Sequence, residues 1–134
     1  MEPITIFKKY AEIKAYYDDD LNKNKDLVKT SNDEPTPIDC VEEMFSKIPL
    51  SVLQNPNFKW LDPCCGCGNF SVVAFNMLSK YHKPKHILEN MLYFNDTNAD
   101  RLEIVRQVFC ANKYALNITM MSFLDYDVNL RKYN

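Results

Sequence analysis

The sequence predicts an α/β fold built on a parallel sheet, and three observations support this. Short apolar runs alternate with amphipathic stretches in the order strand, helix, strand, helix, strand. Polar residues follow the three strands, at Asp62, Asp96 and Ser122. The only two glycines, Gly66 and Gly68, share the loop after the first strand. Because ligands of parallel sheets bind beyond the carboxyl ends of the strands, we expect the site at these residues.

Two helices are expected ahead of the sheet. Residues 4–17 place apolar side chains at mostly helical spacing, which predicts an amphipathic helix followed by a solvated turn at Asp18–Asp20. Thr36 is expected to cap a second helix, with Pro37 in its first turn. That helix ends at Pro49, since proline cannot continue it.

The remaining elements follow from the same periodicities. Strands are short apolar runs that end on polar residues, and helices keep an apolar stripe at a spacing of three and four residues. The expected elements are a turn or short helix over 50–57, a strand over 58–61, a helix over 69–80, a strand over 91–95, a helix over 99–114 and a strand over 117–121.

Composition limits the class of protein. The chain has 134 residues and a mass of 15.7 kDa, which suits one domain; 46% of its residues are hydrophobic, 25% are charged, and the net charge is −2. These values are typical of globular proteins and exclude disordered and collagen-like classes. No basic excess points to a nucleic-acid arm. Without a leader or membrane-spanning run, an intracellular location is expected, with no membrane partner.

The cysteines are expected to be reduced thiols. Their number is odd, and Cys64, Cys65 and Cys67 crowd into four positions, which does not suit a disulfide framework. These three residues could instead be zinc ligands. However, the CCxC spacing is not the paired CxxC of structural zinc sites, so no metal is predicted.

The loop itself favours one class of ligand. The run DPCCGCGNF, residues 62–70, places a carboxylate at a strand end, then glycines, then a helix start. It lacks the third glycine of the dinucleotide fingerprint and the Gly-Lys-Ser/Thr of a phosphate loop. An acid before the loop repels phosphate but suits a cationic ammonium group, such as the one that S-adenosylmethionine carries.

The same run resembles DPACGSGNF, a common form of the first motif of the N6-adenine-specific DNA methyltransferases of restriction-modification systems. The segment ILENMLYFNDTNADRLEIVRQVF, residues 87–109, is similar to that family's second-motif region, which commonly reads ILENNLYGIDINPEAVEIAKLRL. Thr36-Pro37 matches its upstream TP motif. The resemblance covers roughly residues 35–127 and implies a Rossmann-like, S-adenosylmethionine-dependent methyltransferase fold, with the first three strands of the parallel sheet.

The resemblance also implies roles at the cofactor. Thr36 and Pro37 would line its methionine end, Asp62 would receive its ammonium group, and the backbone of residues 64–68 would wrap the sulfonium. Asp96 would accept the ribose hydroxyls, Thr97 would pack against the adenine, and Phe123 would cover its edge. The implied cofactor-binding residues are Thr36, Pro37, Asp62, Cys64, Gly66, Gly68, Asp96, Thr97, Ser122 and Phe123.

Two positions leave alternatives open. The family usually has Asp immediately before the phenylalanine, whereas this chain has Ser122, which can accept a hydrogen bond only without charge. Asp96 could instead serve, with Asn98, as a cap of the following helix.

The family's catalytic motif, (N/D)PP(Y/F), does not occur in this sequence. Asn55-Pro56-Asn57-Phe58 is only similar to it and precedes the first strand, so a turn is expected there. In the usual order the motif would follow residue 134. We therefore expect residues 1–34 to form an N-terminal helix and polar linker, and residues 35–134 to form the cofactor-binding part of a methyltransferase domain, without a catalytic residue.

Three functional interpretations remain. The chain could be the S-adenosylmethionine-binding portion of a DNA adenine methyltransferase, inactive alone, which reaches DNA through the missing part. It could be a regulatory binding module, or one subunit of a split enzyme that a complementing chain completes. An RNA or protein methyltransferase is the least favoured.

An incomplete sheet is also expected to have an open edge near residues 117–121 or at a neighbouring strand. Such an edge predicts association with a second chain or poor solubility. The apolar residues expected to lose their cover are Trp60, Leu61, Leu92, Phe94, Ile118 and Met120.

Overall fold

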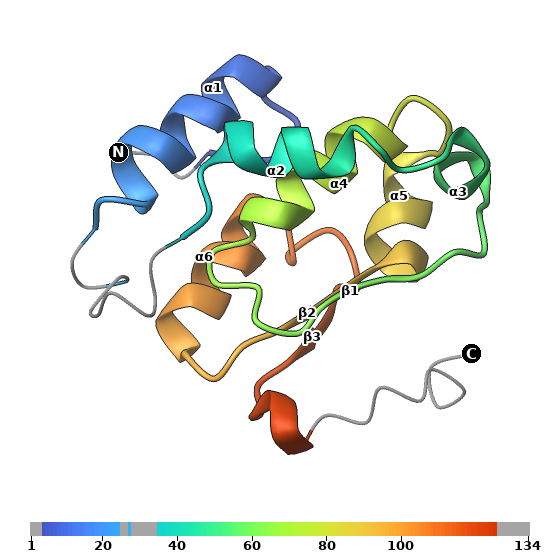
Figure 1. The fold of residues 1–134 in the computed structure, drawn as a ribbon. Helices are drawn as coiled ribbons and strands as arrows, with labels where there is room; N and C mark the ends of the chain where they lie inside the picture. Colours follow the sequence, from blue (N-terminus) through green and yellow to red (C-terminus); the bar gives the residue numbers. More distant parts are fainter. Residues whose placement is uncertain (1–3, 25–26, 28–34, 126–134) are drawn as a thin grey trace.

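The computed structural model describes residues 4–24, 27 and 35–125, which form a mixed helix and strand fold around a parallel sheet (Figure 1). Most of the polar linker expected between residues 22 and 34, and residues 126–134, lie outside this part. The strands are β1 (Trp60–Asp62), β2 (Leu92–Asn95) and β3 (Asn117–Thr119). The helices are α1 (Tyr10–Ala15), α2 (Ile38–Phe45), α3 (Leu50–Gln54), α4 (Asn69–Leu78), α5 (Pro84–His86) and α6 (Ala99–Val108).

The sheet has the order β1-β2-β3, and both pairings are parallel, which confirms the predicted α/β class. Asp62 is paired with Phe94, and Phe94 with Ile118, so these three side chains share one face of the sheet. On that face the Phe94 ring packs against the ring of Phe109, the residue directly after α6, with 4.9 Å between the ring centroids. The carboxyl ends of the strands therefore meet at one edge, as expected.

The N-terminal helix differs from the expectation. It begins at Tyr10 rather than at residue 4, and it continues from Tyr16 to Leu21 as a π-helix, so Asp18–Asp20 are helical and not a solvated turn. Burial explains the extension, because Tyr17 and Leu21 both lie in the core and are four residues apart.

The prediction that Thr36 caps the second helix, with Pro37 in the first turn, is wrong. The cap position of α2 is Pro37 itself, whose side chain has no acceptor. The acceptor comes from another element, since the Asp18 carboxylate accepts a hydrogen bond of 3.2 Å from the backbone N–H of Ile38. Asp18, 20 residues before Ile38, therefore provides the capping acceptor that was expected from Thr36.

A helix between α4 and β2 was not expected. Residues 84–86 form α5, and a π-helical segment, η3 (Ile87–Met91), follows directly. Pro84 suits the first turn of a helix, and the buried Ile87, Leu88 and Met91 have helical spacing. Only the strand that follows was predicted.

The last elements are shorter than predicted. Helix α6 ends at Val108 instead of residue 114, and Cys110 directly after it has a positive φ of 60°. Strand β3 ends at Thr119, and a single 3-10 turn, η4 (Phe123–Asp125), follows.

The N-terminal helices and the sheet share one hydrophobic core. Ile13, Tyr17 and Leu21 belong to the same buried cluster as residues of α4, β2 and α6. The expectation that Leu92 and Phe94 lose their cover is wrong, because they are 1% and 0% exposed. Trp60, Leu61 and Ile118 are half-buried, and of the expected patch only Met120 is exposed. No described helix is both long and apolar enough to pass through a bilayer.

Candidate functional site

The loop from Pro63 to Gly68 joins β1 to α4 at the carboxyl edge of the sheet. Its turns depend on glycine, since Gly66 has a φ of +55° and Gly68 a φ of +99°. The N–H of Gly68 donates to the carbonyl of Cys65 at 2.9 Å, and the N–H of Cys65 donates to the carbonyl of Asn95 at 2.8 Å. The loop is therefore attached to the end of β2.

The two glycines have different surroundings. A Cβ atom at Gly68 would lie 3.0 Å from Cε2 of Phe109 and 3.4 Å from the hydroxyl of Tyr17. Gly68 thus allows the loop to pack closely on the core. A Cβ atom at Gly66 would meet no atom within 4 Å, so the space beside this part of the loop is open.

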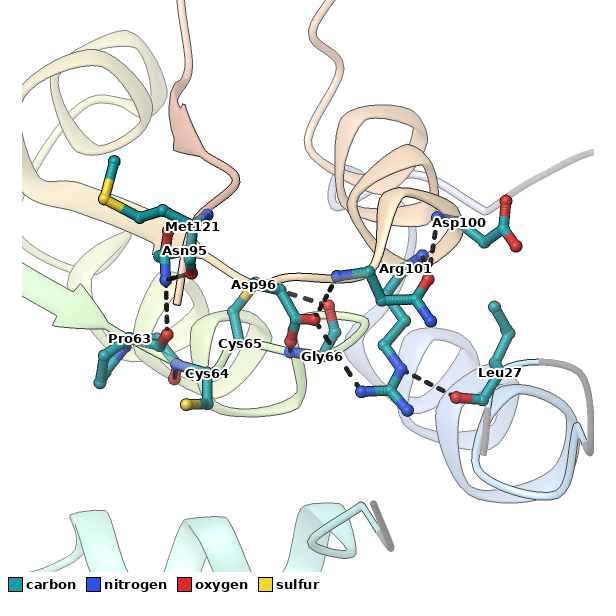
Figure 2. Close-up of polar contacts among 12 residues, drawn as sticks. Leu27, Pro63, Cys64, Cys65, Gly66, Asn95, Asp96, Asp100, Arg101 and Met121 are labelled. Carbon is teal, nitrogen blue, oxygen red and sulfur yellow. Dashed lines mark hydrogen bonds and ion pairs between the residues drawn. The ribbon is translucent and has the colours of Figure 1, made fainter. Parts of the chain in front are cut away.

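Asp96 connects the loop to the end of β2. One carboxylate oxygen, Oδ2, accepts a hydrogen bond of 2.9 Å from the N–H of Gly66 (Figure 2). The other, Oδ1, accepts one of 2.9 Å from Asn98 and lies 3.9 Å from a guanidinium nitrogen of Arg101. The cap of α6 is Asn98, whose side chain accepts from Asp100 and Arg101. Asp96 is therefore not itself the cap of α6. Its carboxylate instead binds the N–H of Asn98, the residue that is the cap.

Asp62 has an unsatisfied carboxylate. Its Oδ1 accepts a hydrogen bond of 3.3 Å from the N–H of Cys64, but its Oδ2 is buried and has no hydrogen-bond partner among the described residues. Burial is the main cause that raises the pKa of Asp62 to about 6; the hydrogen bond from Cys64 opposes this shift, and the nearby charge of Asp96 adds to it. A cationic donor placed here would satisfy the free oxygen and lower the pKa.

A cavity of about 190 Å³ opens beside the loop. It contains four of the ten residues predicted to bind a cofactor: Thr36, Cys64, Gly66 and Asp96. Asp62 does not line this cavity but a second one of about 290 Å³, and Phe70 is the residue that lines both.

The other five predicted residues, Pro37, Gly68, Thr97, Ser122 and Phe123, line neither cavity. Pro37 and Thr97 are exposed, and Gly68 is buried against the core. Ser122 accepts a hydrogen bond of 3.3 Å from the N–H of Leu124, which places it in the turn before η4. Phe123, in η4, is 46% exposed, so its side chain is only partly covered.

Four residues that support the loop were not singled out from the sequence. The Tyr17 hydroxyl donates to the carbonyl of Cys67 at 2.7 Å, and the Asn69 side chain donates to the carbonyl of Thr36 at 2.9 Å. Nε of Arg101 donates to the carbonyl of Leu27 at 2.8 Å, and Asn95 binds Pro63. Asn69, Asn95 and Arg101 lie in the two segments that resemble the family's motifs, whereas Tyr17 lies outside them.

The loop thiols are protected rather than reactive. Cys65 is 4% exposed, and burial raises its pKa well above the ordinary value. Burial also raises the pKa of Cys67 to about 11. Cys64 is exposed, but its pKa is raised too, by partial burial and by the charges of Asp96 and Asp62. No described set of three or more His, Cys, Asp or Glu side chains is arranged to hold a metal ion.

The fold is similar to that of a known protein. The crystal structure of a modification subunit of a putative type I restriction enzyme from Vibrio vulnificus YJ016 superimposes with a TM-score of 0.60 at 21% sequence identity. The likeness covers 94% of this chain and 26% of that one, so this chain spans about a quarter of the length of its structural neighbour. No protein-family model and no curated protein matches the sequence.

This likeness concerns the fold. It agrees with the Rossmann-like architecture that the motifs implied, because the superposition extends over nearly the whole chain. The chemistry of the site has to be argued from its own residues.

Proposed function

We propose that this chain binds S-adenosylmethionine, as the cofactor-binding portion of a site-specific DNA adenine N6-methyltransferase. The observation that carries the proposal is the arrangement of two acids around the glycine loop. Asp62 precedes the loop with a buried, unpartnered carboxylate oxygen, and Asp96 faces the loop from the end of β2. Both lie at the carboxyl ends of parallel strands, where this class of fold binds its ligands.

The residues present fit this cofactor. Oδ2 of Asp62 lacks a donor, which the ammonium group of the methionine half provides. The open space at Gly66 allows a ligand to approach the backbone. Asp96 already accepts two N–H groups, but a carboxylate has about four lone-pair positions, so two remain for a vicinal diol. When bound, S-adenosylmethionine supplies an activated methyl group on its sulfonium.

In this proposal each predicted residue has one role. Thr36 and Pro37 border the methionine end, Asp62 binds the ammonium, and Asp96 binds the ribose hydroxyls. The loop backbone at Cys64, Gly66 and Gly68 borders the sulfonium. Thr97, Ser122 and Phe123 serve the adenine.

We propose further that the chain transfers no methyl group by itself. The amino group of an adenine donates hydrogen bonds, so holding it requires acceptors such as the side-chain oxygen and a backbone carbonyl of (N/D)PP(Y/F), a motif that the sequence lacks. Asn55-Pro56-Asn57-Phe58 lies before β1, at the opposite end of that strand from the glycine loop. Its own contacts are those of a turn, since the N–H of Asn57 donates to the side chain of Asn55 at 2.9 Å.

A complementing polypeptide is the partner that we propose. Strand β1 is an edge of the described sheet and borders the apolar cavity of about 290 Å³. The indole N–H of Trp60 is buried there and has no acceptor among the residues that the structure describes. An added strand along β1 would supply main-chain acceptors and cover the apolar residues of this cavity. DNA would be contacted by that polypeptide, because this chain carries no basic excess.

Calorimetric titration with S-adenosylhomocysteine and with its 2′,3′-dideoxy analogue tests the cofactor site. We expect wild-type protein to prefer the compound with the diol by about tenfold, and Asp96→Asn to reduce this preference. Asp100→Asn, an exposed change four residues away, is the control. A folded wild-type chain that shows neither heat nor a thermal shift would overturn the proposal.

Transfer of a labelled methyl group to mixed-sequence DNA tests the second part. We expect background counts for the chain alone. Counts above background that Asn55→Ala abolishes would contradict the proposal and make the turn before β1 catalytic. Transfer to RNA or protein, but not to DNA, would favour the other methyltransferase class.

A further inference from the structure

The side chain of Asn95 is a fully buried polar group at the centre of the carboxyl edge. It ends β2, is 0% exposed, and uses all of its hydrogen-bonding capacity. Nδ2 donates to the carbonyl of Pro63 at 2.8 Å and to that of Met121 at 2.9 Å. Oδ1 accepts from the Thr119 hydroxyl at 2.8 Å and from the N–H of Met121 at 3.3 Å.

These bonds join three segments that are far apart in the sequence. Pro63 begins the glycine loop after β1, and Met121 follows β3 (Figure 2). Neither segment is part of the sheet ladder, which stops at Asp62 and at Thr119. The carboxamide of Asn95 thus replaces the main-chain pairing that is lost where the strands separate.

The sequence alone would not select this residue. An asparagine at a strand end is typical of turns and caps, and it carries no charge that suggests a ligand. Its role depends on an amide with two donors and an acceptor oxygen, so an isosteric carboxylate cannot replace it: aspartate would present a second acceptor to the carbonyls of Pro63 and Met121.

We propose that Asn95 is the positioning residue that fixes the glycine loop and couples it to the segment after β3. The coupling makes the loop at residues 63–68 depend on the segment at residues 121–123, which serves the adenine in the proposed function. Loss of the Asn95 donors releases the loop and this segment together, while the sheet remains. The effect on ligand affinity rests on the proposed function, but the effect on the loop does not.

The chain has its own reporters of loop opening. Cys65 and Cys67 lie in the loop and are 4% and 8% exposed, whereas Cys110 is equally buried, at 7%, but lies beyond α6. Alkylation of a buried thiol requires opening of the structure around it. The alkylation rate of Cys65 relative to Cys110 therefore separates local opening of the loop from global unfolding.

The experiment compares Asn95→Asp and Asn95→Leu with Asn117→Leu. Asn117 is the matched control, because its side chain also donates to two carbonyls, of Glu89 and Leu92, but at the opposite end of the sheet. Site-resolved mass spectrometry would follow alkylation under native conditions. We expect both Asn95 variants to raise the Cys65 to Cys110 rate ratio by about tenfold, and Asn117→Leu to leave it within about twofold.

Thr119→Val keeps the proposal testable if the Asn95 variants do not fold. It removes the hydroxyl that orients the Asn95 amide and preserves the shape of a half-buried side chain. We expect a smaller rise of the same ratio, about threefold. An unchanged ratio in every folded variant, or an equal rise in Asn117→Leu, would overturn the role of Asn95.

Binding of S-adenosylhomocysteine is measured on the same proteins. If the wild type binds it, we expect at least tenfold weaker binding in Asn95→Asp and no change in Asn117→Leu. If the wild type does not bind it, the proposed function fails, while the alkylation ratio still decides the role of Asn95.

Discussion

Asp62 is an acid whose buried surroundings disfavour its charged form. Its carboxylate is buried at the end of β1, one oxygen has no partner in the described part of the chain, and its pKa is raised from 3.8 to about 6. An isolated buried charge is costly, and proteins keep one only where something compensates for it. This is why we assign the compensation to a ligand.

The first prediction concerns pH. Because the folded state holds the Asp62 proton up to about pH 6, while the unfolded chain releases it near 3.8, the free energy of unfolding should fall as pH rises through this window. The loss should be on the order of 2–3 kcal/mol. Asp62→Asn should remove this contribution and be the more stable protein at pH 7. Urea denaturation of both proteins at pH 4 and pH 7 measures how much the free energy of unfolding changes with pH. The same change in the wild type and in Asp62→Asn would refute the prediction.

The second prediction concerns the two glycines. Gly68→Ala should cost about 2–4 kcal/mol, because the new methyl group meets Phe109 and the backbone has a φ that disfavours a Cβ atom. Gly66→Ala has open space and a φ that alanine tolerates better, so it should cost about 1 kcal/mol. Denaturant unfolding of both variants gives the comparison. Equal losses in the free energy of unfolding would mean that close packing on Phe109 does not explain why glycine is needed at position 68.

At the scale of elements, the N-terminal helix supports the site although it contributes no predicted ligand. The hydroxyl of Tyr17 holds the loop at Cys67, and the side chain of Asn22 accepts a hydrogen bond of 3.0 Å from Asn69. Asp18 supplies the start of α2 with its acceptor. A helix before the sheet thus orders both the loop and the neighbouring helix.

The third prediction tests this contact between helices. Asp18→Ala should lower the free energy of unfolding by about 1 kcal/mol, because the N–H of Ile38 loses its acceptor. Asp19→Ala, the exposed neighbour in the same π-helix, should change it by less than about 0.5 kcal/mol. Thermal and urea unfolding measure both. If both variants lose the same free energy of unfolding, the cause is the loss of negative charge from the π-helix and not the loss of the hydrogen bond to Ile38.

For the whole molecule, the two edges of the sheet are not equivalent. β3 is followed by a chain that Asn95 ties back to the sheet, whereas β1 borders an apolar cavity with an unsatisfied indole N–H. The sequence pointed first to the edge near residues 117–121. The cavity and the free Trp60 donor favour the β1 edge, so we place the complementing strand there.

The fourth prediction follows from this asymmetry. Without a complementing chain, copies of the protein should associate at high concentration through β1. Phe58→Lys, at a 43% exposed position just before β1, should reduce the association, and Met120→Lys, at a 58% exposed position just after β3, should not. Size-exclusion chromatography with light scattering measures both. A wild-type protein that remains monomeric, or an effect of Met120→Lys alone, would contradict the choice of edge.

The sequence by itself determined the parallel sheet and the place of the loop. Strand runs, helical stripes and two glycines within three positions are local patterns, and the backbone responds to them over a few residues. For this reason the sequence predicts β1, β2 and β3 within two residues at each end, and it predicts that Asp62, Gly66 and Asp96 lie at one edge of the sheet.

The tertiary structure decided which groups satisfy one another. Asp18 caps α2 from 20 residues away, and Asn95 joins segments 32 and 26 residues distant. Such hydrogen-bond partners meet only after the chain has folded, so no local sequence pattern predicts them. The same holds for the unsatisfied oxygen of Asp62, because a buried polar atom without a partner is a property of the packed molecule, and the sequence shows only that an acid is present.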